Sequence, residues 1–229
     1  MDSVDNGVAL NLIMLGAPGA GKGTHAERFA QAHRIPKVST GEILREAVQT
    51  GTEIGLRAKA IMDRGELVSD EVMVGIVRER LDRADAARGC ILDGFPRTVA
   101  QAIALDGIMT GRAPLIVVDI VVPAAELVRR LGSRLVCEVC GTLAEPGRAA
   151  CGTCEGRLVQ RADDNQSVVL DRLDVYERKT RPLVDFYSAR PTFCTVDGAQ
   201  APDRVAAALE TAVAAAAERS RGAVRGAFR

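Results

Sequence analysis

A glycine-rich segment near the N-terminus constrains the fold of this chain more than any other part of the sequence. The segment GAPGAGKGT, residues 16–24, follows an apolar run and precedes a stretch with helical periodicity. Its glycines permit backbone angles at which successive N–H groups point inward and form a cradle for anionic oxygens. The dipole of the following helix and the charge of Lys22 strengthen that attraction. The segment therefore predicts a strand, a phosphate-binding loop and a helix, in that order.

Apolar runs of strand length alternate with longer helical patterns along the 229 residues. We expect strands at 8–15, 37–38, 90–92, 115–121 and 193–196, and helices near 22–33, 41–50, 70–84, 98–110, 124–135, 168–189 and 202–219. Two helix starts carry capping signals, Ser39 with Glu42 and Ser69 with the two acids that follow it. The alternation predicts an α/β fold in which helices cover both faces of a parallel sheet.

Charge and hydrophobicity exclude several classes of protein. Lys and Arg number 30, as do Asp and Glu, so the chain lacks the basic excess typical of proteins that bind nucleic acid or acidic membranes. No run reaches the roughly 18 apolar residues of a membrane span. The N-terminal sequence MDSVDNG has no apolar region of the kind that secretory signals carry. We therefore expect a cytoplasmic protein without nucleic-acid or membrane partners, in which thiols stay reduced.

Four of the six cysteines form two CxxC pairs, Cys137 with Cys140 and Cys151 with Cys154, and ten residues separate the pairs. In a reducing compartment this spacing is typical of a tetrahedral zinc site with four thiolate ligands rather than of disulfides. Because the protein fills all four coordination positions, no position is open for a substrate, and we expect a structural Zn2+ ion. The spacing leaves open whether iron or cobalt replaces zinc in the cell. The other two cysteines fall in apolar strand patterns and are expected in the core.

A second polar segment, DGFPRT at residues 93–98, follows directly after the expected strand at 90–92. Ligands of open α/β sheets bind beyond the carboxyl ends of the strands, where this segment would lie. Asp93 could there hold the water molecules around a Mg2+ ion, or it could cap a helix or pair with Arg97. The segment therefore predicts a second part of the ligand site.

Four segments in order along the chain resemble the signatures of the nucleoside monophosphate kinases, and of the adenylate kinase family with a zinc-containing LID in particular. They are GxPGxGKGT, STGEILR at 39–45, DGFPRT, and QRADDN at 160–165, and the resemblance covers about residues 9–215. It implies a P-loop fold of three layers around a five-stranded parallel sheet. It also implies a core domain of residues 1–38, 69–130 and 169–229, a helical NMP-binding insertion at 39–68, and a zinc-binding LID at 131–168.

The same resemblance assigns the phosphate loop to ATP and Mg2+. Arg130 resembles the guanidinium that stacks on the ATP adenine. The hydroxyl of Thr24 stands one place later than the magnesium-binding hydroxyl of most such loops, because Gly23 follows Lys22. The implied ATP-binding residues are Gly19, Ala20, Gly21, Lys22, Gly23, Thr24, Arg130, Arg134 and Gln200.

For the second nucleotide, Thr40 and Gln101 resemble the side chains on the adenine side of an AMP site. Arg45 and Arg97 resemble its phosphate-binding arginines. Three apolar residues match the wall of that site, although ordinary core packing explains them equally well. The implied AMP-binding residues are Thr40, Arg45, Met62, Leu67, Val68, Gly94, Arg97, Gln101, Arg161 and Arg172. The implied catalytic residues are Lys22, Asp93, Arg97, Arg134, Arg161 and Arg172, and the implied LID hinge residues are Asp163 and Asp164.

The activity implied by the resemblance is reversible phosphoryl transfer from MgATP to AMP, giving two ADP, by a monomeric enzyme. The acceptor phosphate is already anionic, so the reaction needs two polyanions held in line and charge neutralisation rather than a general base. The arginines and magnesium would supply that neutralisation. The insertions at 39–68 and 133–166 would close over the site and exclude water.

Several alternatives stay open. Related UMP/CMP kinases typically carry SAG and DGFPRN where this chain has STG and DGFPRT, which favours AMP over another acceptor. Use of GTP as the donor is also compatible with the sequence. A different class is a regulatory P-loop ATPase whose zinc ribbon binds nucleic acid, and against it stand the zero net charge and 3% aromatic residues. A catalytically inactive nucleotide-binding module would lack Lys22 or the phosphate arginines, and all of them are present. The LID is also shorter between its cysteine pairs than is usual in the family, which puts its contacts to ATP in doubt.

Overall fold

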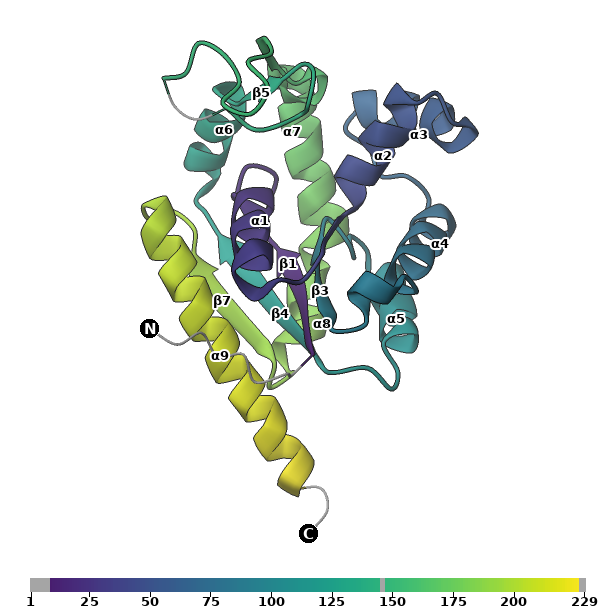
Figure 1. The fold of residues 1–229 in the computed structure, drawn as a ribbon, viewed down its shortest axis with the longest axis vertical. Helices are drawn as coiled ribbons and strands as arrows, with labels where there is room; N and C mark the ends of the chain where they lie inside the picture. Colours follow the sequence, from purple (N-terminus) through teal and green to yellow (C-terminus); the bar gives the residue numbers. More distant parts are fainter. Residues whose placement is uncertain (1–8, 145–146, 227–229) are drawn as a thin grey trace.

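A parallel sheet of five strands forms the centre of the computed structural model, which describes residues 9–144 and 147–226 (Figure 1). The strand order is β2-β3-β1-β4-β7, and every neighbouring pair is parallel. The strands are β1 (Leu10–Leu15), β2 (Lys37–Ser39), β3 (Gly89–Asp93), β4 (Leu115–Val121) and β7 (Phe193–Asp197). This confirms the α/β fold and the strands expected from the apolar runs, except that Val8 lies outside the described residues.

The register of the sheet brings three polar segments to one edge. Ser39 at the end of β2 pairs with Asp93 at the end of β3, and Met14 of β1 also pairs with Asp93. The glycine-rich loop leaves β1 one residue later, after Leu15. Segments that are far apart in the sequence therefore meet at the carboxyl ends of adjacent strands, where open α/β sheets bind ligands.

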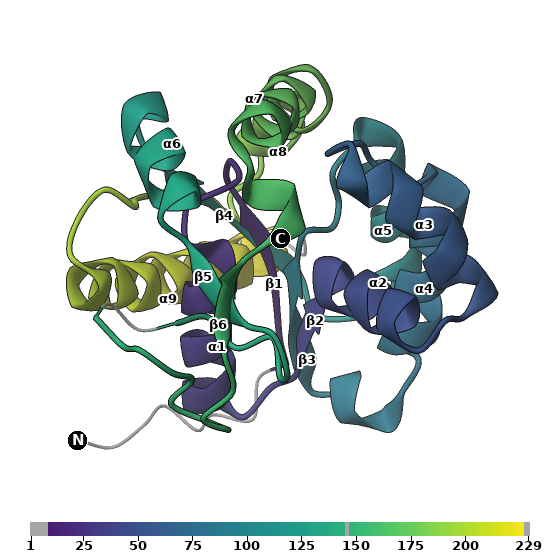
Figure 2. The ribbon, with the colours of Figure 1, turned by 90° about the horizontal axis from the view of Figure 1, so that it is seen from above.

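Helices cover both faces of the sheet, so the strands are apolar on both sides (Figure 2). Ile13 and Leu15 pack in one buried cluster, and Leu12 and Met14 pack in the other. The first cluster includes residues of α4 (Asp70–Leu81), α5 (Val99–Ile108) and α8 (Pro182–Ser188). The second includes residues of α1 (Lys22–His33), α6 (Ala124–Gly132) and α9 (Pro202–Gly226).

Two segments stand outside this three-layer arrangement, on opposite sides of the sheet edge (Figures 1 and 2). One is the helix pair α2 (Thr40–Gln49) and α3 (Glu53–Asp63), within the expected insertion at 39–68. The other contains the antiparallel pair β5 (Leu135–Cys137) and β6 (Leu158–Gln160), followed by the short helix η2 (Ala162–Asp164). A further short helix, η1 (Ala84–Ala86), precedes β3.

Several expected helices have different limits in the structure, and the one expected at 70–84 ends at Leu81. The helix expected at 124–135 ends at Gly132, because Leu135 begins β5. The helix expected at 168–189 consists of α7 (Gln166–Val175), a turn of π-helix η3 (Tyr176–Thr180), and α8. Pro182 lacks a backbone N–H and its ring would clash within a continuous α-helix, and the wider turn precedes it. The last helix continues beyond residue 219 to Gly226.

The expected capping box is wrong. Ser39 precedes α2 but makes no side-chain cap, and its hydroxyl instead donates to Asp93 Oδ2 at 3.4 Å. Glu42 accepts a hydrogen bond from Lys37 at 2.8 Å. Ser69 likewise makes no side-chain cap to α4. Side-chain caps are found on α3, α5 and α7, from Thr52, Thr98 and Asn165. Among the described residues, no helix is long and apolar enough to cross a membrane.

Candidate active site

The loop between β1 and α1 has the backbone conformation that its glycines predict. Gly16, Gly19 and Gly21 have φ angles of 136°, 86° and 91°, in the left-handed region that side chains disfavour. A Cβ atom at Gly16 would lie 2.6 Å from the carbonyl oxygen of Ile120. Glycine is therefore required at the start of the loop both for its backbone angle and for its closeness to β4.

Lys22 is a buried cation inside this loop. Its Nζ donates hydrogen bonds to the carbonyl oxygens of Gly16 at 2.7 Å and Ala17 at 2.9 Å. Burial, together with the charges of nearby arginines, lowers the pKa of Lys22 to about 8, although Asp93 acts in the opposite direction. An anion bound in the loop would therefore meet a lysine whose positive charge is not neutralised by an ion pair among the described residues.

Asp93 faces the loop rather than serving as a helix cap. A Cβ atom at Gly23 would lie 3.3 Å from Asp93 Oδ2, which also accepts the hydrogen bond of Ser39. The following helix α5 is capped by Thr98. Within the described residues Asp93 makes no ion pair with Arg97, so of its three interpretations the magnesium-facing one fits this geometry best.

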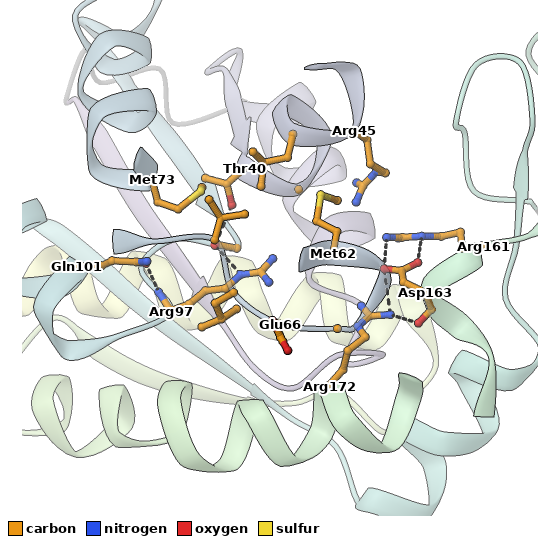
Figure 3. Close-up of a pocket in the computed structure, with 16 residues that line it drawn as sticks. Thr40, Arg45, Met62, Glu66, Met73, Arg97, Gln101, Arg161, Asp163 and Arg172 are labelled. Carbon is orange, nitrogen blue, oxygen red and sulfur yellow. Dashed lines mark hydrogen bonds and ion pairs between the residues drawn. The ribbon is translucent and has the colours of Figure 1, made fainter. Parts of the chain in front are cut away.

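A pocket opens between α2, α3 and the turn after β3 (Figure 3). All ten residues that the resemblance assigned to AMP line this pocket. They are Thr40, Arg45, Met62, Leu67, Val68, Gly94, Arg97, Gln101, Arg161 and Arg172.

Two arginines in this pocket keep donors that the protein does not use. Arg45 makes no hydrogen bond or ion pair among the described residues, and burial, with the charge of Arg161, lowers its pKa to about 10. Arg97 donates through Nε to the carbonyl oxygen of Gly94 at 2.8 Å, and burial lowers its pKa as well. In Figure 3 both guanidiniums extend into the pocket from different elements. Half-buried guanidiniums without an ion pair among the described residues are suited to bidentate contact with a phosphate.

Two uncharged polar side chains, Thr40 and Gln101, also line the pocket, next to Arg97. Thr40 donates through Oγ1 to the carbonyl oxygen of Gly94 at 2.8 Å. Gln101 is buried, and its Oε1 accepts a hydrogen bond from the backbone N–H of Arg97 at 2.7 Å. Its Nε2 donates to Asp70 Oδ1, also at 2.7 Å. Sequence reasoning treated Asp70 only as part of a helix start, because its contact to Gln101 spans 31 positions.

Three further arginines converge beside the pocket on two carboxylates. Arg161 forms a bidentate pair with Asp163, with distances of 3.0 and 2.8 Å. Arg134 forms another with Asp164, and Arg172 contacts both acids. Burial alone would raise the pKa of Asp163, but the guanidiniums outweigh it and lower that pKa. The cluster carries three positive and two negative charges, so an incoming anion would compete with the carboxylates for the same donors.

Two residues assigned to ATP, Arg130 and Gln200, lie at or near the turn after β7, which adjoins the phosphate loop. Arg130 donates through Nε to Glu126 at 2.7 Å and through Nη2 to the carbonyl oxygen of Gly198 at 3.0 Å. A Cβ atom at Gly198 would lie 3.4 Å from the carbonyl oxygen of Ala20, so this turn abuts the loop. Gln200 is exposed and donates to Asp197 at 3.2 Å.

The four cysteines of the CxxC pairs come together in the β5–β6 segment. Their sulfur atoms all lie within 4.8 Å of one another, with individual separations of 3.4 and 3.5 Å. A tetrahedral ion with bonds of about 2.3 Å separates its sulfur ligands by about 3.8 Å, so the residues fit a Zn2+ ion. A Cβ atom at Gly156 would lie 2.8 Å from Cys137 Sγ, and glycine at this position therefore keeps space beside the cluster.

Comparisons with known proteins agree with this geometry. The sequence model of the adenylate kinase family matches residues 14–192. The chain is similar to an adenylate kinase of Archaeoglobus fulgidus, at 48% identity over 82% of this chain and 91% of that protein. It is also similar to adenylate kinases of Lysinibacillus sphaericus, at 44% identity over 88% and 96% of the two chains. An adenylate kinase of Bacillus thuringiensis is 45% identical over 89% of this chain and 98% of that protein.

The family match spans the phosphate loop, the pocket, the arginine cluster and the four cysteines, so sequence similarity and geometry point to one assignment. The chain therefore belongs to the adenylate kinase family.

Proposed function

We propose that this enzyme transfers a phosphoryl group directly and in line between two nucleotides bound on either side of Lys22. Membership of the adenylate kinase family implies the overall reaction, which is reversible phosphoryl transfer from ATP to AMP with two ADP as products. The observation that carries the proposal is the pocket, which is lined both by half-buried guanidiniums and by an oriented amide.

In this pocket Arg45 and Arg97 bind the AMP phosphate, and Thr40 and Gln101 contact the base. The unused guanidinium donors of Arg45 and Arg97 support the first assignment. An amide that can donate and accept at once suits the polar edge of adenine, which supports the second. The apolar side chains Met62, Leu67 and Val68 form the wall against which the base packs.

On the other side of Lys22, the N–H groups of residues 19–24 and the lysine itself bind the ATP phosphates. Arg130 and Gln200 lie beyond the loop and contact the ATP base. A kinase reaction of this type uses Mg2+ with ATP, and the ion neutralises phosphate charge when it is bound. Asp93, through water molecules, and the Thr24 hydroxyl would hold it.

Arg134, Arg161 and Arg172 stabilise the charge on the transferring group. Each is paired with Asp163 or Asp164, so binding of the nucleotides must draw the guanidiniums from the carboxylates to the phosphates. Oriented donors of this kind are the main source of rate in phosphoryl transfer. The acceptor oxygen is anionic, so the protein needs no group to remove a proton.

We assign the core domain to residues 1–38, 69–130 and 169–229, the NMP-binding insertion to 39–68 and the LID to 131–168. The insertion and the LID close over the site and exclude water, with Asp163 and Asp164 at the LID hinge. The four cysteines hold a structural Zn2+ ion that cross-links the LID.

The test measures ADP formation from MgATP with AMP, CMP, UMP, GMP or no acceptor. We expect rapid turnover only with AMP. Turnover with another acceptor would overturn the base contacts, and equal ADP formation without acceptor would mean an ATPase. Arg97→Ala should lower kcat/KM for AMP by at least about 100-fold with the fold intact. Arg57→Ala is the matched control, because Arg57 lies on α3 with 79% of its side chain exposed.

A further inference from the structure

We propose that Asp70 is a positioning residue that fixes the orientation of the Gln101 amide and thereby makes the acceptor pocket select 6-amino over 6-oxo purines. This inference rests on the proposed function, in which Gln101 contacts the acceptor base. Asp70 itself does not line the pocket. It lies at the first position of α4 and contacts Gln101, which does line the pocket.

Asp70 joins the starts of two helices. Its Oδ1 accepts a hydrogen bond from Gln101 Nε2 at 2.7 Å, and its Oδ2 accepts one from the hydroxyl of Thr98 at 3.0 Å. Thr98 in turn caps α5 by accepting from the backbone N–H of Gln101 at 3.1 Å. The side chain and the backbone of Gln101 are therefore both held, directly or through Thr98, by one carboxylate.

The two neighbours of the Gln101 amide have opposite and fixed hydrogen-bonding character. A carboxylate only accepts hydrogen bonds, and the backbone N–H of Arg97 only donates one. If the amide turned over, its oxygen would face the carboxylate and its NH2 group would face the N–H. Both contacts would then be repulsive, and Gln101 is only 2% exposed, so water could not relieve them. The order of donor and acceptor on this amide is therefore fixed before a nucleotide binds.

The amide keeps unused capacity for a ligand. Nε2 has a second N–H and Oε1 has a second lone pair, and Gln101 lines the pocket. Adenine presents an amino donor at C6 next to an acceptor at N1, whereas hypoxanthine presents an oxygen acceptor at C6 next to a donor at N1. A freely turning amide could match either base by turning over. A fixed amide matches only one arrangement of donor and acceptor on the base. In this pocket the base must donate to Oε1 and accept from Nε2, which the C6 amino group and N1 of adenine can do.

The experiment compares AMP with IMP, which differ at this edge and keep the same phosphate and sugar. The variant Asp70→Asn has almost the shape of Asp70 but can donate as well as accept, so it removes one of the two contacts that fix the orientation of Gln101 and leaves only the contact with the Arg97 N–H. We expect the ratio of kcat/KM for AMP to that for IMP to fall by at least about tenfold. The change should lie in KM, while kcat at saturating AMP stays within about twofold, because Asp70 does not touch the phosphates.

Two further variants make the result decisive. Asp82→Asn removes a carboxylate just beyond the other end of α4, where it pairs with Arg112, and should leave the ratio unchanged. Asp70→Ser, whose hydroxyl can also donate and accept, replaces Asp70→Asn if that variant does not fold. A purely structural role for Asp70 would lower kcat/KM for AMP and IMP equally, and an unchanged ratio would overturn the proposal.

The outcome also separates this inference from the function on which it rests. If the unsubstituted enzyme phosphorylates no nucleoside monophosphate, the proposed function fails. If it uses AMP and IMP equally well, or if it prefers AMP and Asp70→Asn keeps that preference, the function stands and the role of Asp70 fails.

Discussion

Arg134 and Asp164 form a bidentate ion pair in which both nitrogen–oxygen distances are 2.6 Å and the Asp164 side chain is completely buried. Arg134 lies just before β5, and Asp164 lies shortly after β6. The pair therefore joins the two ends of the cysteine-containing segment at its base. Asp164 also accepts from Arg172 at 2.8 Å, so the same carboxylate connects that segment to α7.

Replacement of the buried Asp164 by alanine should destabilise the protein more than replacement of the exposed Asp185. Removing one partner of a buried ion pair costs about 3–5 kcal/mol, because the other charge remains buried. The arginine partners of Asp164 are 20% and 17% exposed, so we expect about 2–3 kcal/mol after allowance for solvent. The free energy of unfolding in urea measures the loss. Asp185→Ala, at an acid that is 84% exposed, is the control, and equal losses for Asp164→Ala and Asp185→Ala would contradict the prediction.

Binding of ATP should be accompanied by proton uptake at alkaline pH. In the free protein burial lowers the pKa of Lys22 to about 8, so at pH 9 most Lys22 side chains are neutral. Bound phosphates favour the charged form and raise this pKa, so the complex takes up a proton. Calorimetric titrations at pH 9 in two buffers of different ionisation enthalpy give the number of protons bound.

The same titration with Lys22→Met provides the control, because this variant has no ammonium group to protonate. Uptake should disappear in the variant and should decline in the unsubstituted protein as the pH falls below 8. Equal proton uptake by both proteins would assign the proton to another group. Burial of the charged Lys22 lowers the free energy of unfolding most below pH 8. This destabilisation declines as the pH rises from 8 toward 10.5, which is opposite to the pH dependence of a lysine that an ion pair stabilises.

Removal of zinc should unfold the cysteine-containing segment while the core keeps its structure. All four ligands lie between residues 137 and 154, and only Cys137 and Cys151 among them are buried. The two buried clusters around the sheet contain none of the four. Chelation should therefore lower the melting temperature, and hydrogen exchange should show lost protection within residues 133–160 alone.

Metal content provides an independent check of this prediction. The purified protein should contain one zinc ion per chain, and Cys140→Ser should lower that content. Cys194→Ser should not, because Cys194 lies on β7, whose residues belong to the central sheet. A melting temperature that stays the same with and without metal would refute a structural role for the ion.

The strands and the pocket could be predicted because their signals are local. Each strand is a short apolar run, and Lys22, Thr40, Arg45 and Arg97 stand at fixed positions within short signatures. The structure adds that these signatures meet at one edge of the sheet, since Ser39 and Met14 both pair with Asp93. The signatures meet because the strands run parallel and end at the same edge. The alternation of strand and helix patterns predicts a parallel sheet, but it does not predict the order of the strands.

The features that sequence reasoning missed depend on partners far along the chain. The capping box at Ser39 fails because Asp93, 54 residues away, takes the serine hydroxyl. Strands β5 and β6 have three residues each, too few for periodicity to show, and they are joined to the cysteine cluster through Cys137. The contact between Asp70 and Gln101 required knowledge of how α4 and α5 pack.

The helical stretch from α7 through η3 to α8 also has a mechanical consequence. Leu183 and Tyr187, in the C-terminal part of this stretch, are fully buried in the core. Arg172, in its N-terminal part, lines the pocket. With a rise of about 1.5 Å per residue, Arg172 lies roughly 12 Å from Thr180, and a tilt of about 5° there displaces it by about 1 Å. Displacement of about 1 Å can slow a reaction about 100-fold. The position of the Arg172 guanidinium in the pocket therefore depends on the rigidity of the π-helical turn Tyr176–Thr180, as well as on its contacts with Asp163 and Asp164.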